Sequence, residues 1–519
     1  MQNAYILRLL SSFLFFATLA FATASEAENE LFASPSPDDS QWIQRAKAAA
    51  AKDKLVTQID FVRLQTDVLF QQALRPGLTG PDVTHRPPGP VAINLLPNMA
   101  PIVVNTTNVE RSAPGYLEWT GYLEGDPQDV VTFVVKEGSD VMQRDAILVG
   151  TIVVGGRTFR LRPAQQGTHA IIEINTSAFP PEGRPRTLYS TPIPYGAEET
   201  ARIREMALHL ASPLTTCRID VLVVYTTAAK QAKCNVCTPK EATSLSDIET
   251  IYLDIREAIQ QANTSYARSG IKQRLHLVND PPPASYEIHY PQANDLSTDL
   301  TNIYNAPQAM PGNPIYPLNL AHEWRDHHGA DLVSLWETDP ASDECGMSNW
   351  MLENSPGVVE SSPENAYSVV PRSCAVGQFS MAHEFGHLGA AHHDRGYSEA
   401  IGNPPYDHFS YGYVLPLPSN GTTEKQPISI MAKPAESCPT DAAANGISCC
   451  ITNCTRGKGF WSNPERTYHD SVSDFHGVRT GATDTNNHTD NRRILNISAE
   501  VLANYRPPLV KSGVCTGGH

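Results

Sequence analysis

This 519-residue sequence lacks four features that mark common classes of protein. No cysteine precedes Cys217, so residues 1–216 form no disulfide of their own and offer no thiolate to a metal. No block of basic residues occurs and the net charge is −16, which argues against nucleic acid or an anionic membrane as a partner. No internal repeat is present, and no apolar run beyond the N-terminal one is long enough to cross a bilayer. The length indicates two or three globular domains.

The first 24 residues are typical of a secretory signal peptide. Arg8 precedes a short apolar stretch, Leu9 to Phe21, and Ala22-Thr23-Ala24 provides a cleavage site before Ser25. The alternative is an uncleaved N-terminal anchor, although the stretch is short for a membrane span. We expect a secreted, extracellular protein with no integral membrane segment after the signal is removed.

The ten cysteines are even in number and follow a predicted signal peptide, which indicates disulfides formed in an oxidising compartment. Cys234 and Cys237 have a spacing that also occurs in metal and redox sites, but a structural disulfide role fits a secreted chain better. We interpret a later cluster in the same way, as cysteines that form structural disulfides in a loop-rich region: Cys438, Cys449, Cys450 and Cys454.

The most informative segment is His383-Glu384-Phe385-Gly386-His387. On a helix, each residue turns by about 100°, so His383 and His387 lie one turn apart on one face and can converge on one zinc ion. Glu384 is then the neighbour that reaches the attacking water. His393 can add a third nitrogen only if the helix ends and the chain turns back. Three nitrogens and an open fourth position indicate a catalytic zinc site.

This arrangement resembles the metzincin zinc peptidases, whose signature is HExxHxxGxxH followed by a methionine turn. The segment Ser429-Ile430-Met431-Ala432 matches that turn, and Asp394 after the last histidine is similar to the reprolysin-like branch. The resemblance implies Zn²⁺ bound by His383, His387 and His393. It also implies a catalytic Glu384 and an apolar floor formed by Met431, and it suggests a disulfide between Cys345 and Cys374.

The sequence departs from the metzincin signature at one position. The glycine expected at 390 is Ala390, and Gly389 stands one place early. An alanine at positive φ costs on the order of 1 kcal/mol. Either the turn stays at Ala390 with His393 as the third ligand, or the helix ends at Gly389 and His392 binds instead. The family spacing favours His393. Asp394 either anchors the turn after the third histidine or makes a surface charge pair.

Composition and periodicity divide the chain into six parts. Residues 102–175 alternate apolar and polar positions in four strand-like segments, with Gly155-Gly156 as a hairpin turn. The parts are a signal peptide (1–24), a flexible, proline-rich N-terminal region (25–101), a β-rich propeptide-like domain (102–175), a processing linker (176–216), a metzincin-like zinc peptidase domain (217–508) and a C-terminal tail (509–519).

The peptidase domain is expected to be an α/β layer fold, because strands and helices alternate along it. A nearly continuous apolar run at 218–225 predicts a strand buried on both faces. The other predicted elements are a helix from Leu245 to Tyr266, strands at 273–278, 331–336 and 367–370, and a final helix from Asn491 to Tyr505. The resemblance implies a twisted mixed sheet above the cleft, with an edge strand for substrate between 330 and 370.

The N-terminal domain carries no obvious catalytic residue, and we interpret it as a propeptide that assists folding and covers the cleft. Because it has no cysteine, latency must use a carboxylate, a histidine such as His169, or steric blockage. The alternative is a permanent accessory domain. Arg202-Ile203-Arg204 is a weak candidate for the processing site.

The predicted function is a secreted zinc endopeptidase that hydrolyses protein or peptide substrates, with Glu384 as general base. One alternative is a weakly active or inactive zinc-binding relative that acts as an extracellular binding module. Another is a different HExxH hydrolase, which His393 and Met431 argue against. A second histidine pair, His322 and His327, is five residues apart, so the two do not share a helical face. The oligomeric state is not indicated.

Overall fold

The computed structural model describes most of the chain beyond residue 29. The described residues are 30–65, 68, 90–138, 146–186, 215–232, 246–278, 286–338, 344–351, 353–355, 358–359, 363–400, 409–416, 425–434, 450, 454–468, 478–479, 481, 489–506 and 515–517. The predicted signal peptide, the segment Arg202-Ile203-Arg204, and Cys234, Cys237, Cys438 and Cys449 lie outside these residues.

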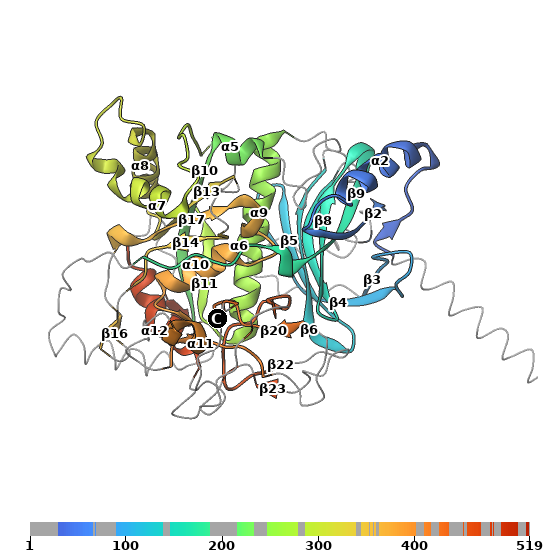
Figure 1. Cartoon of the computed structure of the whole chain (residues 1–519). Coiled ribbons are helices and arrows are strands. Elements are labelled where there is room, and N and C mark those ends of the chain that lie inside the picture. Colours follow the sequence, from blue (N-terminus) through green and yellow to red (C-terminus); the bar gives the residue numbers. More distant parts are fainter. Residues whose placement is uncertain are drawn as a thin grey trace, which may run out of the picture.

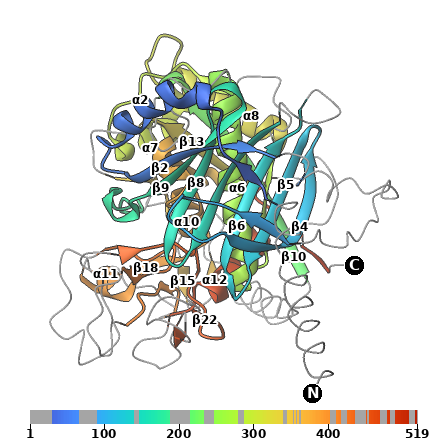
Figure 2. The ribbon, with the colours of Figure 1, turned by 90° about the vertical axis from the view of Figure 1, so that its right-hand side faces the viewer.

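The first layer is an antiparallel sheet of nine strands (Figures 1 and 2). Strands β3 to β9 follow one another in space as they do in the sequence, and β2 and then β1 extend the sheet beyond β9. Gly155 and Gly156, with φ of 53° and 72°, make the turn between β7 and β8, which confirms the expected hairpin. The strands are β1 (Phe32–Ala33), β2 (Val56–Leu64), β3 (Val91–Ile93), β4 (Ile102–Ala113), β5 (Tyr116–Leu123), β6 (Asp126–Lys136), β7 (Ile147–Val154), β8 (Arg157–Pro163) and β9 (Thr168–Ile174).

The prediction that 25–101 is a flexible region was wrong for a large part of it. Strands β1, β2 and β3 belong to the sheet, and helix α2 (Ser40–Ala50) packs on it, with the Trp42 ring 5.0 Å from the Phe61 ring. Strand β2 lacks a regular alternation of apolar and polar residues, because Asp60 and Arg63 each fall on a face that is otherwise partly apolar. The sequence pattern alone therefore did not predict this strand. Strand β2 is held in the sheet by pairing with the distant strand β9, where Phe61 lies opposite Ala170.

The second layer is a mixed sheet with the order β11-β10-β13-β17-β14, and β12 and β24 also pair with β10. Its four central strands are parallel, whereas β14 and β24 run antiparallel to their neighbours. The four long strands confirm the predicted segments. The strands are β10 (Thr215–Thr226), β11 (Gln273–Leu277), β12 (Glu287–Ile288), β13 (Leu332–Glu337), β14 (Met347–Ser348), β17 (Tyr367–Pro371) and β24 (Cys515–Gly517).

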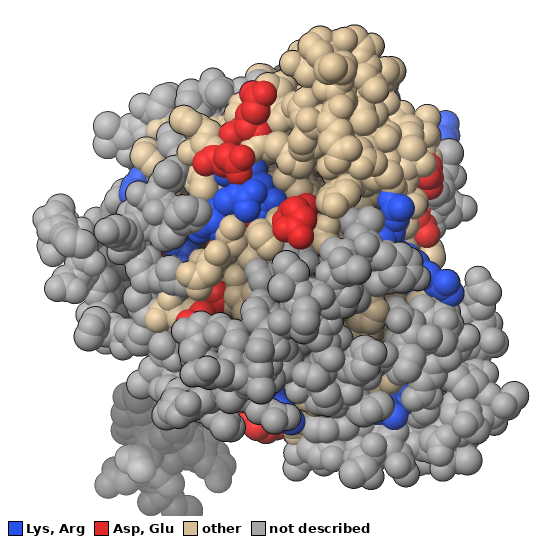
Figure 3. All heavy atoms as spheres, turned by 90° about the vertical axis from the view of Figure 1, so that its left-hand side faces the viewer, with Lys and Arg blue, Asp and Glu red and all other residues tan. Residues whose placement is uncertain are grey.

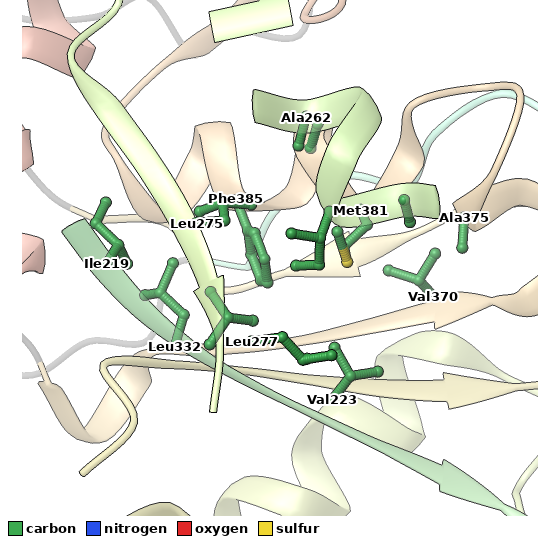
Figure 4. Close-up of a cluster of buried hydrophobic side chains, with 14 of the residues drawn as sticks. Ile219, Val223, Ala262, Leu275, Leu277, Leu332, Val370, Ala375, Met381 and Phe385 are labelled. Atoms are coloured by element: carbon green, nitrogen blue, oxygen red, sulfur yellow. The ribbon is translucent and has the colours of Figure 1, made fainter. Parts of the chain in front are cut away.

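Alternate residues of β10 enter two different cores, as expected for a strand covered on both faces. Ile219 and Val223 join the core that contains Phe385 of the histidine helix, which Figure 4 shows. Leu222 and Val224 face the opposite core, beneath helices α7 (Leu296–Asn305) and α8 (Asn319–His328). The sheet therefore lies between two helical layers, and the predicted α/β class is confirmed.

Helix α6 (Asp247–Ser269) separates the two sheets (Figure 1). It starts with a capping box formed by Ser246 and Glu249 and ends at Gly270, which has a φ of 74°. It begins two residues after the predicted start and runs three residues past the predicted end. The remaining helices are α5 (Thr227–Gln231), α9 (Arg372–Ala375), α10 (Ser380–Leu388), α11 (Arg395–Ala400) and α12 (Asn491–Leu502).

The contact between the N-terminal sheet and the part of the chain that follows it contains buried ion pairs. Arg162 of β8 binds Glu257 of α6 at 2.5 Å, and both side chains are fully buried. Lys458 binds Asp129 at 2.7 Å and Asp126 at 3.0 Å, again with almost no exposure. Such pairs are stable only while both partners are present, because one charge left alone in a buried site is strongly unfavourable.

Three disulfides occur among the described residues. Cys345–Cys374 confirms the pair that the family resemblance suggested, and Cys450–Cys454 closes a short loop. Cys217–Cys515 joins β10 to β24. Residues 515–517, within the predicted C-terminal tail (509–519), therefore form a strand of the sheet. The local sequence did not reveal this strand because a disulfide to a distant residue holds it.

Among the described residues, no helix is both long and apolar enough to span a membrane. The face shown in Figure 3 carries acidic and basic side chains close to one another on the described residues.

His169 lies inside the N-terminal sheet, so it was wrongly considered as a latency device. Its Nε2 atom accepts a hydrogen bond from the Leu148 amide, and the side chain is buried. Burial lowers the pKa of His169 to about 4. The folded sheet therefore holds a neutral imidazole at a pH where the unfolded chain would be protonated.

We expect His169→Gln to reduce the acid sensitivity of this sheet. The unfolded state binds the extra proton below about pH 6.5, so His169 should lower the free energy of unfolding as pH falls from about 6.5 to about 4, by up to about 3 kcal/mol. Denaturant unfolding of the full chain at pH 7 and 4.5 measures this change. Wild type should lose more stability than the variant. Equal losses would contradict the assignment.

Candidate metal centre

Helix α10 places the first two histidines of the motif side by side. His383 and His387 lie one turn apart, and both are buried. The Nδ1–H of His383 donates to the Ile430 carbonyl at 2.7 Å, and that of His387 donates to the Ala391 carbonyl at 2.8 Å. Because a carbonyl can only accept, each ring carries its proton on Nδ1. Both Nε2 lone pairs are left available to a metal.

The chain reverses directly after this helix, at Ala390. Helix α10 ends at Leu388, Gly389 has an ordinary φ of −98°, and Ala390 takes a φ of 66°. Of the two alternatives that the sequence left open, the turn at Ala390 is the one formed. The displaced glycine is therefore not used for its conformational freedom.

The reversal brings His393, on β18 (His392–Asp394), back to the helix. Its Nε2 atom lies 3.1 Å from that of His383 and 3.1 Å from that of His387. His392 lies elsewhere, with its ring 3.8 Å from the Trp350 ring. Among the described residues, the three histidines 383, 387 and 393 form the group of side chains able to hold a metal ion.

The spacing of these nitrogens fits zinc. Zn–N bonds of about 2.0–2.1 Å in a tetrahedral site separate two nitrogens by roughly 3.3 Å, close to the 3.1 Å found here. Burial lowers the pKa of His387 to about 3 and the pKa values of His383 and His393 well below their usual range. The rings are therefore neutral, as ligation requires.

Glu384 lies on the same helix beside these rings and is almost fully buried. Burial raises the pKa of its carboxyl, and the negative charge of Glu182 raises that pKa further. Gly346, next to edge strand β14, covers the carboxylate so closely that a Cβ there would lie 2.7 Å from Glu384 Oε1. The edge strand and the base are thus in direct contact.

Met431 packs beneath the middle of the histidine helix. A Cβ at Gly386 would lie 2.5 Å from the Met431 sulfur, so only glycine allows this approach. Asp394 is buried and accepts the amide protons of Tyr397 and Lys433, each at 3.0 Å. It anchors the turn after His393 to the segment that follows Met431. Of the two roles considered for Asp394, the anchoring role is the one observed.

Sequence reasoning missed a segment that lies along the edge strand. Cys345 donates its amide proton to the Pro181 carbonyl at 2.9 Å, and Gly183 donates to the Gly346 carbonyl at 2.8 Å. Further on, Arg186 forms a parallel bridge with Asn349. We call residues 181–186 the edge segment. The edge segment lies beside residues 345–349 in the manner of an added strand. These residues fall within 330–370, the range predicted to contain the substrate-binding edge strand.

The edge segment also brings a carboxylate to the centre. Glu182 is buried and contacts Ser380 and Arg456, two residues that were not predicted as functional. Arg456 directly follows strand β21 (Cys454–Thr455) and lies 76 positions after Ser380 in the sequence, so no local motif joins them.

The second histidine pair is not a metal site in the described structure. His322 hydrogen-bonds through Nε2 to the Ile303 carbonyl at 2.7 Å and through Nδ1 to the Tyr367 hydroxyl at 2.8 Å. Both of its nitrogens are therefore engaged, which leaves His322 no lone pair for a metal.

Comparison with known proteins was consistent with this geometry. A family model described as Metallo-peptidase family M12, of reprolysin type, matches residues 216–458. A peptidyl-Asp metalloendopeptidase of Stenotrophomonas maltophilia (strain R551-3) is 26% identical over 410 residues, covering 77% of this chain and 79% of that protein. One of Xanthomonas campestris pv. campestris is 26% identical over 358 residues, covering 69% and 67%.

A solved structure of a chaperone–substrate complex also aligns, with a TM-score of 0.34 and 17% identity. The alignment covers 56% of this chain and 36% of that one.

Exchanging the strained alanine and its neighbour tests the turn. We expect Ala390→Gly to raise the free energy of unfolding by about 1 kcal/mol, because glycine adopts positive φ without strain. We expect Gly389→Ala to lower it by about 1–3 kcal/mol, because the new Cβ would lie 2.6 Å from Leu495 Cδ2. Denaturant unfolding compares the two variants. A stabilising Gly389→Ala or a destabilising Ala390→Gly would place the turn elsewhere.

Proposed function

The chain carries a zinc metalloendopeptidase domain of the reprolysin-like M12 family, and we propose that this domain works as the active part of a secreted proenzyme. In this proposal, His383, His387 and His393 bind the zinc ion and Glu384 is the general base. The observation that carries the proposal is the convergence of three neutral Nε2 atoms beside a buried carboxylate.

Each residue has a defined part in peptide hydrolysis. When bound, zinc supplies Lewis-acid activation of water and of the scissile carbonyl. Glu384 takes a proton from the attacking water and delivers it to the leaving amine. A raised pKa suits this double task, because the group must both accept and release a proton. Met431 and Gly386 keep the helix in place below the ligands.

We propose that the cleaved bonds lie next to aspartate. The two bacterial relatives are named peptidyl-Asp metalloendopeptidases. In this chain, the cationic residues Arg456 and Lys433 act electrostatically on the histidines and on Glu384. A positive field at the cleft favours an acidic substrate.

The N-terminal sheet acts as a propeptide in this proposal, with a signal peptide at 1–24 and processing within 187–214. The edge segment supports this idea, since it lies where a substrate strand would bind. The disulfides support export to an oxidising compartment. Because the buried ion pairs hold the two parts together, cleavage of the linker alone should release the sheet slowly.

A weakly active relative that only binds partners is the second candidate. Its support was the missing glycine at 390, but Ala390 makes the same turn and His393 reaches the centre. The intact set of three histidines and Glu384 favours the enzyme.

Two substitutions separate metal binding from catalysis. Glu384→Gln should retain zinc and reduce kcat about 10²–10⁴-fold, since the general base is lost. His387→Ala should lose the metal itself. Zinc content by mass spectrometry and hydrolysis of an aspartate-containing peptide, with and without a chelator, measure both effects.

Chelated wild type should match His387→Ala in activity. Full activity of Glu384→Gln, or zinc retained at full occupancy in His387→Ala, would contradict the assigned roles.

A further inference from the structure

We propose that Arg456 and Ser380 form the pocket that recognises the acidic side chain of a substrate, and that Glu182 fills this pocket in the uncut chain. The inference rests on the proposed function, because it assigns residues to the specificity of that same site. Arg456 and Ser380 are the groups that would bind the negatively charged side chain of the substrate.

The carboxylate of Glu182 is bound as a ligand would be. Its Oε1 atom accepts a hydrogen bond from the Ser380 hydroxyl at 2.8 Å and forms a salt bridge with Arg456 at 2.5 Å. The Glu182 and Arg456 side chains are 1% and 7% exposed, so the pair is shielded from water. A charge-assisted bond of this kind discriminates strongly against an uncharged side chain.

Arg456 is held in position by the peptidase part itself. Its guanidinium donates to the Ala432 carbonyl at 2.9 Å and to the Gln378 carbonyl at 3.4 Å. Ala432 directly follows Met431, and Gln378 lies just before α10. The arginine therefore keeps two of its contacts when the edge segment leaves, and it loses only its anionic partner.

The pocket adjoins the reacting groups. Ser380 lies on the histidine helix, one turn before His383. A Cβ at Gly346 would lie 2.7 Å from Glu384 Oε1 and 3.1 Å from Glu182 Oε2, so one small residue separates the pocket from the base. A side chain in this pocket thus belongs to a residue at or next to the bond that is cut.

Removal of the edge segment leaves a buried guanidinium without its carboxylate. An arriving aspartate or glutamate side chain can restore the ion pair that Arg456 has lost. A neutral side chain of the same shape cannot. The uncut chain therefore needs no cysteine to block the site. The carboxylate of Glu182 occupies the pocket that binds an acidic substrate side chain.

A neighbouring residue provides a matched control. Lys458 is also buried and pairs with carboxylates of the N-terminal sheet, Asp126 and Asp129. Its partners lie on β6, away from the edge segment. Lys458→Gln should therefore weaken the hold on the sheet and leave the choice of substrate unchanged.

The test uses processed enzyme obtained from the full chain and two peptides that differ only by aspartate or asparagine at the cleaved position. Wild type should prefer the aspartate peptide at least about 100-fold in kcat/KM. In Arg456→Gln this ratio should fall below about 5, chiefly through loss of the aspartate reaction. Ser380→Ala should lower the ratio several-fold, and Lys458→Gln should keep it.

Inhibition by a peptide of the edge segment tests the same contact in a double-mutant cycle. A synthetic peptide covering residues 177–187 should inhibit wild-type enzyme at least about 30-fold better than the same peptide with Glu182→Gln, and Arg456→Gln enzyme should not distinguish the two. Zinc content and melting temperature report whether each variant is folded. If Arg456→Gln does not fold, Ser380→Ala and the two inhibitor peptides decide.

The outcomes separate the two proposals. An enzyme that cuts neither peptide contradicts the proposed function. An enzyme that cuts both equally well, or an Arg456→Gln variant that keeps the wild-type preference, contradicts the pocket while leaving the peptidase intact.

Discussion

The constraint on which the structure depends is that three buried imidazoles must converge, with the Nε2 atom of His393 3.1 Å from the Nε2 atoms of both His383 and His387. Two of them come from one helix face, which any regular helix provides. The third requires the chain to stop the helix and reverse within three residues. Ala390 adopts positive φ to do so, although a glycine stands next to it. The turn is held from outside by Asp394, which ties it to the segment after Met431.

Around this centre, the packing uses glycine where two groups must approach closely. Gly386 admits the Met431 sulfur below the helix, and Gly346 admits Glu384 at the edge strand. The histidine helix is fixed from behind by the core that Phe385 shares with β10. The reactive side chains are therefore positioned by elements that are themselves buried, so the site is formed before a substrate arrives.

The N-terminal sheet meets the rest of the chain through ion pairs as well as through apolar contacts. Arg162 and Lys458 pair with carboxylates across the contact, and Glu182 carries a carboxylate into the cleft itself. Release of the sheet, as proposed, would return both charges of each pair to water, where each regains its own hydration. A purely apolar contact would leave an exposed apolar patch after the proposed release.

The sequence was sufficient for the features that depend on local patterns. The strands of the second sheet, the long helix α6, the two histidines of α10 and the Gly155-Gly156 turn all follow from periodicity or spacing. Features set by distant pairing were not predictable in this way. Strand β2 depends on β9, strand β24 depends on a disulfide to Cys217, and the contact of Glu182 with Arg456 joins residues 274 positions apart. The choice between His392 and His393 depended on the turn at Ala390, which only the three-dimensional structure resolves.

The most direct test of this account is a crystal structure of the purified protein with data collected on both sides of the zinc absorption edge. The account predicts one anomalous peak at bonding distance from the Nε2 atoms of His383, His387 and His393, with Glu384 beside it and His392 turned away. A peak bound by His392, or no peak in folded protein supplied with zinc, would contradict it.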